Sequence, residues 1–483
     1  MRILLGLASC AALLGIVGCR TTSQVLRDYE ANVTVGNYKA AAPEVAELAR
    51  KNDDSRLLWH LLAASGYYLA DDKPNAIGQF DAAEDAMQRN DQASVFSQTG
   101  QGTLAMMTND RSFPYDGGGQ DRIFTCLYKA IDFLSMGQEA GARTELNRAS
   151  QYQANWIFDR RRDIEAASAR LQKDADAYVR QKNTQAMGDR TQQTATVLAD
   201  ASFAAQVQQN CGFNPATSGN LESLSEGDYV NTYAQHVTGV FRWLRNDGGE
   251  SYLKTAARLA SGNPAVVRDA TECAQGGKPK NQVWIWVEDG LCPSREEWRV
   301  DLPLILLPFV RHYLPYVGMA LPVLRERTWG AASWSVQCSG SEQRLAFADL
   351  ANVDKLVKTE YDVYMRGALT REITRTIVKA GVQVALGVTA DNVSDRNTRL
   401  ALKLSQLGVA TWAATSTAAD LRSWTTLPKT VKCIRVDRPS DGRIDIWADG
   451  QQIQLTMAEG NSLVFVRKPG PQAMPVVKQV TFK

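Results

Sequence analysis

The spacing of apolar residues changes near Val283, and this change constrains the fold more than any other feature of the chain. Upstream, apolar residues recur every three or four positions, which is typical of helices. From Val283 they alternate, so that Val283 and Ile285 would face one side of a strand and Trp284 and Trp286 the other. The sequence therefore predicts an α+β protein, mainly α, with a helical region followed by a smaller β domain.

The downstream region, residues 280–483, is predicted to be a small antiparallel β-sandwich-like domain with inserted packed helices. Glu288–Gly290 is typical of a turn, and the alternation in Glu297–Leu302 predicts that this run pairs with 283–287, with one buried and one exposed face. We expect strands within 283–345 and 430–483 and helices within 346–425. The last strands are expected at 431–436, 443–448, 451–457, 463–467 and 476–482.

Two of the inserted helices are rich in small apolar residues. They are expected at Arg366–Ala390 and Thr398–Ala419, after a first helix at Ala346–Thr370. Neither apolar run reaches the roughly 18–20 residues that are needed to cross a bilayer, so both are predicted to be packed core helices. A membrane-inserting or oligomerising hairpin is the alternative.

The upstream region, residues 25–275, is predicted to be a tetratricopeptide-like helical repeat region, with a possible sub-boundary near 210–227. Small residues at fixed offsets let paired helices approach, while large ones fill the groove to the next pair. An irregular helical bundle is the alternative to repeats. Within this region, residues 156–206 are polar, which predicts an exposed helical arm or hairpin. The residues at repeat offsets are Tyr67, Ala76, Phe80 and Ala83; Ala130, Phe133, Ala142, Leu146 and Ala149; and Val240, Trp243, Tyr252, Ala256 and Leu259.

The N-terminus has the pattern of a bacterial lipoprotein signal. A basic start precedes an apolar run that ends in Ile16-Val17-Gly18-Cys19. The pattern predicts a signal peptide over 1–18, an acylated Cys19 and a tether over 19–24. Arg20 stands where an aspartate would favour the inner membrane, so we expect the periplasmic side of a Gram-negative outer membrane. An ordinary secretory peptide or a transmembrane helix is the alternative.

Composition narrows the classes of partner and chemistry. The 54 Lys and Arg residues nearly balance the 52 Asp and Glu residues, so no nucleic-acid partner is expected. The 3 histidines are far apart in the sequence, which argues against a histidine-built metal site. Six further cysteines follow Cys19, and in an exported protein they would lie in an oxidising compartment. We therefore expect one or two disulfides among them, but the sequence does not define which cysteines pair. These are Cys126, Cys211, Cys273, Cys292, Cys338 and Cys433.

The sequence predicts no catalytic residue, no cofactor-binding residue and no metal ligand. Gly117-Gly118-Gly119 resembles a phosphate-cradling segment, but no GxGxxG or GK[ST] follows, so it is predicted to be a conformational loop. Asp420 and Arg422 are predicted to form a structural ion pair at a helix–sheet junction that also contains Trp424.

One apolar run is a candidate contact surface. Prolines within and beside it exclude a continuous transmembrane helix. Burial between the helical and β parts is the favoured interpretation, and an exposed surface for a partner or for domain docking is the alternative. The run contains Leu304, Ile305, Leu306, Leu307, Phe309 and Val310.

Motifs scattered over most of the mature chain resemble one family. They are Tyr128–Leu134 with Gly137 and Ala142–Leu146, Val283–Pro293, Arg299–Pro303, Tyr316–Pro322 and Ala419–Pro428. Together they resemble an uncharacterised family of bacterial outer-membrane lipoproteins with tetratricopeptide-like helical repeats. The resemblance implies an envelope protein without an assigned enzymatic activity. The Pro-rich insert at 304–315 and the extra cysteines depart from the family's usual pattern.

The function predicted from these features is that of a lipid-anchored periplasmic scaffold or adaptor with no catalysis of its own. Its partners would be the membrane, through Cys19, and envelope proteins or peptides, through the groove of the helical repeats. No cofactor is expected. The alternative is an envelope enzyme or accessory factor that acts on peptidoglycan, glycan or lipid.

Overall fold

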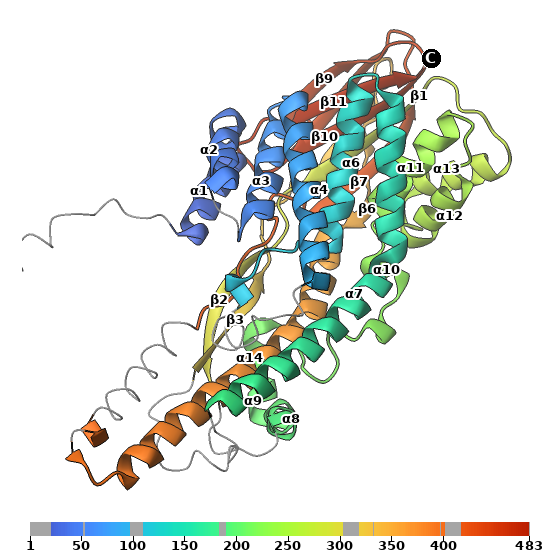
Figure 1. The fold of residues 1–483 in the computed structure, drawn as a ribbon. Helices are drawn as coiled ribbons and strands as arrows, with labels where there is room; N and C mark the ends of the chain where they lie inside the picture. Colours follow the sequence, from blue (N-terminus) through green and yellow to red (C-terminus); the bar gives the residue numbers. More distant parts are fainter. Residues whose placement is uncertain are drawn as a thin grey trace, which may run out of the picture.

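The computed structural model describes residues 21–482 except 52–53, 97–109, 183–189, 303–317, 332, 397 and 401–416. The predicted signal peptide, Cys19, the candidate contact surface at 304–310 and most of the predicted helix at 398–419 therefore lie outside the described residues. The fold of the described part is α+β and mainly α, with most helices in the first half of the chain and most strands in the second (Figure 1).

The elements have the following bounds. The helices are α1 Thr22–Thr34, α2 Tyr38–Lys51, α3 Arg56–Leu69, α4 Lys73–Phe96, η1 Asp110–Ser112, α6 Gly119–Ser135, α7 Glu139–Lys182, α8 Arg190–Ala199, α9 Ala201–Cys211, η3 Leu221–Ser223, α10 Glu226–Tyr229, α11 Thr232–Leu244, α12 Glu250–Leu259, α13 Pro264–Ala274 and α14 Val353–Asn392. The strands are β1 Gln282–Asp289, β2 Ser294–Asp301, β3 Gly318–Arg325, β4 Trp334–Cys338, β5 Leu345–Ala346, β6 Ala348–Asn352, β7 Thr430–Asp437, β8 Arg443–Ala448, β9 Gln451–Thr456, β10 Asn461–Lys468 and β11 Val476–Phe482.

Consecutive helices of the first half pack side by side, notably α3 with α4, α6 with α7 and α11 with α12 (Figure 1). Short turns join them, and Gly137 adopts a φ of 72° between α6 and α7, a conformation that glycine tolerates best. Ala76 and Phe80 of α4 and Ala142 of α7 are completely buried. Small residues at these positions allow the close approach of neighbouring helices.

β1 is the central strand of a five-stranded sheet with the order β11-β10-β1-β7-β6. It pairs in parallel with β10 and antiparallel with β7. The predicted hairpin between 283–287 and 297–302 is therefore wrong. Residues 294–301 form β2, which pairs with β3 in a separate two-stranded ribbon. The local alternation does not specify the partner, because β10 lies far downstream in the sequence and is brought to β1 only by tertiary packing.

The protein has three layers where the sheets are. On one face of β1, Val283 and Ile285 pack against a four-stranded sheet with the order β5-β4-β8-β9. On the other face, Trp284 and Trp286 pack into the core of the helical layer. All eight residues of β1 are buried, so the exposed face that the hairpin prediction required is absent from this strand.

A long arm extends from the layered body (Figure 1). It is built on α7, with 44 residues, and α14, with 40 residues. At about 1.5 Å per residue these helices measure roughly 66 and 60 Å. The prediction of separate helices ending near Thr370 and Ala390 is corrected to one continuous helix, and residues 348–352, expected in a helix, form strand β6.

The arm has its own hydrophobic core, in which α14 packs against α8, α9 and the β2–β3 ribbon. Tyr361, Met365, Leu369 and Ile373 supply the α14 side of it. This second core stabilises α14 by burying one of its faces, which an isolated helix would leave in water.

The six cysteines of the described part are all free thiols, so the expectation of one or two disulfides is wrong for this structure. They come from separate elements and four are buried. Among the described helices, none is long and apolar enough to cross a membrane.

Candidate functional site

The three consecutive glycines at the start of α6 form a cradle around a buried carboxyl group of the protein itself. Glu360 Oε1, from α14, accepts hydrogen bonds of 2.8 Å from the backbone N–H of Gln120 and from Trp156 Nε1 of α7. A Cβ atom on Gly118 or Gly119 would overlap Glu360 or Trp156, so the two glycines are required by this close approach. The loop therefore joins three helices where the arm meets the body.

Burial raises the pKa of Glu360, and the nearby Asp121 carboxyl acts in the same direction. The two donated hydrogen bonds and the positive end of the α6 dipole oppose that rise. Asp121 itself accepts from Gly118 N–H at 2.9 Å and from Tyr115 Oη at 2.7 Å. The cradle is filled by these groups, which supports the prediction of a conformational loop over a phosphate site.

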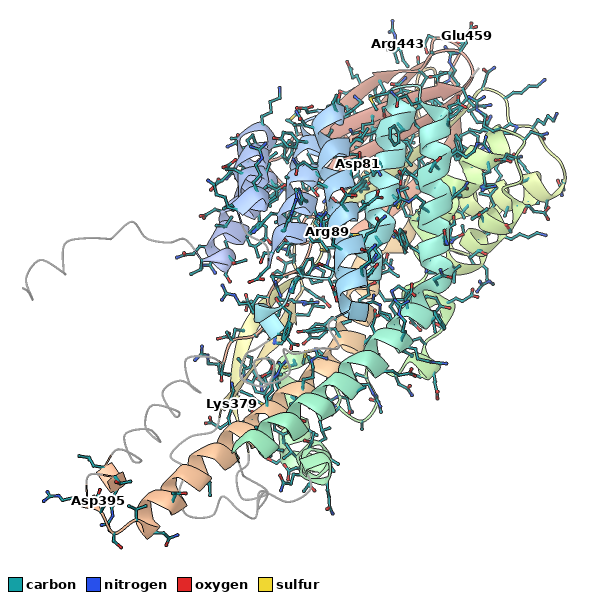
Figure 2. All side chains as sticks on the ribbon, in the orientation of Figure 1. Asp81, Arg89, Lys379, Asp395, Arg443 and Glu459 are labelled. Atoms are coloured by element: carbon teal, nitrogen blue, oxygen red, sulfur yellow. The ribbon has the colours of Figure 1, made fainter. Side chains whose placement is uncertain are left out.

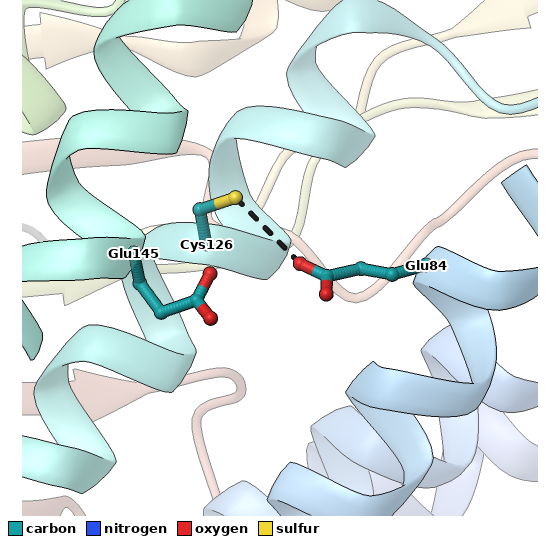
Figure 3. A group of neighbouring side chains, drawn as sticks. All are labelled: Glu84, Cys126 and Glu145. Carbon is teal, nitrogen blue, oxygen red and sulfur yellow. Dashed lines mark hydrogen bonds between the residues drawn. The ribbon is translucent and has the colours of Figure 1, made fainter. Parts of the chain in front are cut away.

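A second cluster contains one thiol and two carboxylates and has the donor set of a metal site (Figure 3). Glu84 from α4, Cys126 from α6 and Glu145 from α7 are buried, and one ligand atom from each lies within 4.8 Å of the others. The sequence prediction named Cys126 only as a possible disulfide partner and gave none of the three residues as a metal ligand, because they come from three helices and have no metal-binding spacing.

Two cations of the protein already compensate this acid–thiol cluster. Lys129 Nζ lies 2.9 Å from Glu84 and 2.8 Å from Glu145. Arg148 Nη1 lies 2.9 Å from Glu84. Burial, together with the charge of Glu84, raises the pKa of the Cys126 thiol well above its usual value, which opposes formation of a thiolate ligand. The arrangement favours an internal ion network that joins α4, α6 and α7.

A third cluster has the connectivity of a Cys-His-Asp triad. Cys433 Sγ lies 3.9 Å from His236 Nδ1, and His236 Nε2 lies 2.9 Å from Asp269 Oδ2. However, Trp286 Nε1 donates to the same Nδ1 at 3.0 Å, so this nitrogen is an acceptor and the ring proton lies on Nε2. The lone pair that a general base needs is thus already used.

The histidine cluster is also closed to substrate. His236 and Asp269 are 0% exposed and Cys433 is 1% exposed. Burial raises the pKa of the Cys433 thiol well above its usual value. Asp269 further accepts from Trp284 Nε1 at 2.9 Å and pairs with Arg435 at 2.8 Å. These contacts describe a polar tie between α11, α13, β1 and β7.

The same interface between helices and sheet contains a buried glutamate. Glu288, at the end of β1, accepts hydrogen bonds of 2.8 Å from Tyr128 Oη of α6 and Tyr233 Oη of α11. Arg467 of β10 lies 3.5 Å away. Burial raises the pKa of Glu288 although Arg467 acts in the opposite direction. The sequence prediction placed Glu288 in a turn, because its buried position depends on helices distant in the sequence.

The structure brings the predicted junction residues together. Arg422 Nε lies 2.8 Å from Asp420 Oδ1, and Arg422 also donates to the carbonyl of Asp54 at 2.7 Å. Trp424 Nε1 donates to Ser65 Oγ of α3 at 2.7 Å. This segment therefore joins the chain before β7 to the residues just before α3 and to the second half of α3.

Comparisons of the chain with protein-family models, with curated proteins and with solved structures found no match. The family resemblance and the function that it implies therefore stay predictions. The buried polar clusters described above serve as internal ties, and the arm is the most distinctive external feature of the described structure.

Proposed function

We propose that this protein is a lipid-anchored periplasmic scaffold or adaptor of the outer membrane, and that it binds envelope proteins. The observation that carries the proposal is the arm, an extension that is built on the distal parts of the long helices α7 and α14 and is joined to a layered body. Such a shape suits a protein that holds a partner at a fixed place relative to its anchor.

Polar contacts along the arm support its stiffness. Where the arm begins, Glu360 joins α14 to α6 and α7. Further along, Asp110 pairs with Arg371 at 2.6 Å and with Arg375 at 2.7 Å. Burial opposes ionisation of Asp110, but the two guanidinium groups outweigh it and hold the pKa of the carboxyl well below its usual value. Charged pairs shielded from water in this way limit bending between the helix and the body.

The first described helix supports a short tether at the membrane end. Thr21 caps α1 with a capping box, so the helix begins at Thr22, three residues after Cys19. Three residues span at most about 11 Å. An acylated Cys19 would therefore hold the body directly at the bilayer surface.

The finer architecture is part of the same proposal. We assign α3–α4, α6–α7 and α11–α12 as diverged tetratricopeptide-like units, whose groove would take envelope proteins or peptides, and the two larger sheets as a sandwich-like unit. Complete burial of Ala76, Phe80 and Ala83 supports the first assignment. The shared core between the sheets supports the second.

The partner proposal is tested by crosslinking in intact cells. A photo-crosslinking amino acid at Phe158, which is 69% exposed on α7, or at Asp395 near the arm tip should capture a defined envelope protein. The matched control is Arg443, an exposed position at the opposite end of the molecule (Figure 2). Equal capture at all three positions, or capture of none at the arm, would contradict a partner-binding arm.

The anchor has a separate test. Cys19→Ser should abolish incorporation of radiolabelled palmitate and release the protein from the membrane fraction, because no other position would receive acyl chains. Ser23→Ala, in the first turn of α1, is the control and should leave both measurements unchanged. The predicted tether of 19–24 is shortened, because α1 begins at Thr22. Continued labelling and membrane retention of the Cys19→Ser variant would show that the lipoprotein assignment is wrong.

A further inference from the structure

The outer face of the four-stranded sheet carries polar and aromatic side chains in an ordered array. Strand alternation places the apolar residues of β4, β8 and β9 toward the core between the sheets, so the intervening residues point away from it. The register of the pairing sets these intervening residues into two rows across the strands. The rows are Ser335–Trp447–Gln452 and Gln337–Asp445–Gln454.

Trp447 is the centre of this array, which we call the sheet platform. The indole ring is half-buried, while its Nε1 atom is itself buried and has no hydrogen-bond acceptor among the described residues. The guanidinium carbon of Arg344, just before β5, lies 4.0 Å from the ring centre. A large ring on the outer face of a sheet, with one long exposed side chain over it, is suited to stack against an external ligand.

The groups around the ring are suited to hydroxyl ligands. Gln452 and Gln454 are exposed, and neither amide makes a hydrogen bond within the described residues. Each offers a donor pair and an acceptor in one plane. Asp445, in the same row as Gln454, adds an acceptor without a cationic partner in the described structure. Planar amide and carboxylate groups can bind neighbouring hydroxyls in pairs.

The charge and size of the platform select the class of ligand. The positive charge of Arg344 is balanced by the negative charge of Asp445, which disfavours a polyanion such as a nucleic acid. Strands lie about 4.8 Å apart and alternate residues about 6.8 Å apart, so three strands and two rows cover roughly 10 by 7 Å. That area corresponds to about two pyranose rings in a flat arrangement.

We propose that the sheet platform binds a neutral oligosaccharide. One pyranose ring stacks on Trp447 in place of the Arg344 guanidinium, which then donates to sugar hydroxyls. The amides of Gln452 and Gln454 bind the hydroxyls of the next ring. This inference goes beyond the proposed scaffold function, because it concerns a glycan and a face at the opposite end of the molecule from the arm.

Calorimetry with the full chain in detergent tests the inference. The probes are the hexasaccharides of N-acetylglucosamine and of glucose, with dextran sulfate as the anionic comparison. We expect one neutral hexasaccharide to bind with an affinity that hardly changes with salt, because no charge is neutralised. Failure of both neutral probes, or binding of dextran sulfate alone with a steep salt dependence, would overturn the proposal.

Variants locate the site. Trp447→Ala should weaken binding by about tenfold, which corresponds to the ~1.4 kcal/mol of a good aromatic contact. Gln454→Ala, at an exposed position, should weaken it with the fold retained. Phe158→Ala removes a more exposed aromatic from α7 and should leave glycan binding unchanged. Unchanged affinity in both platform variants would place the glycan elsewhere, whereas crosslinking at the arm tests the scaffold function independently.

Discussion

Asp269→Ala should lower the free energy of unfolding by about 3–5 kcal/mol, because it removes one partner of a buried ion pair. Asp269 pairs with Arg435 at 2.8 Å and accepts hydrogen bonds from His236 and Trp284. Without the carboxylate, the ring N–H of His236 and the indole N–H of Trp284 would lose their acceptor in a place that water does not reach. Urea unfolding followed by circular dichroism measures the loss.

Glu272→Ala is the matched control for this prediction. Glu272 contacts the same Arg435 guanidinium at 2.7 Å, but its side chain is 33% exposed. An ion pair with one partner open to water contributes less than about 1 kcal/mol. We therefore expect a small loss for Glu272→Ala, and equal losses in the two variants would contradict the view that burial determines the strength of this tie between helices and sheet.

Gly119→Ala should destabilise the junction between the arm and the body by about 3 kcal/mol. The added methyl group would overlap the Trp156 ring and would lie 2.9 Å from Glu360 Oε1. Overpacking of this kind typically costs about 1–3 kcal/mol. Displacement of Trp156 would also remove one of the two donors to the buried Glu360 carboxylate, at a cost of about 1–3 kcal/mol.

Hydrogen exchange can localise the effect of Gly119→Ala. Amides of α6, the middle of α7 and the first third of α14 should exchange faster, while those of β1 should not change. The control is Gly78→Ala in α4, where a Cβ atom would meet nothing within 4 Å. This exposed helical site should gain about 0.5–1 kcal/mol of stability. Slower exchange at the junction of the Gly119→Ala variant would contradict the proposed close packing.

The β1 strand illustrates how far periodicity predicts structure. Alternation correctly gives a strand with Val283 and Ile285 on one face and Trp284 and Trp286 on the other. The prediction of one exposed face overlooked a signal in the sequence, because all five residues of 283–287 are apolar and such a continuous run is typical of a strand that is buried on both faces. The pairing with β10 is likewise a long-range choice that no local signal near β1 contains.

The candidate site was harder to predict than the fold. Glu84, Cys126 and Glu145 lie on three helices and become neighbours only when α4, α6 and α7 pack. The run Gly117-Gly118-Gly119 is visible in the sequence, but the residue whose close packing requires these glycines is not. That residue, Glu360, comes from a helix more than 200 positions away. The predicted ion pair between Asp420 and Arg422 required no knowledge of the tertiary structure, because the two residues are neighbours in the sequence.

The sequence by itself determined the classes of element: helices before residue 280, strands after it, a polar helical arm and turns at the Asp-Gly pairs. These follow from side-chain periodicity and backbone preference, which act over a few residues. Only the tertiary structure decided the partners of each strand, the union of two predicted helices into α14 and the internal charge pairs. Those depend on which buried surfaces and charges fit together across the whole chain, because a charge is stable in the core only beside a distant partner.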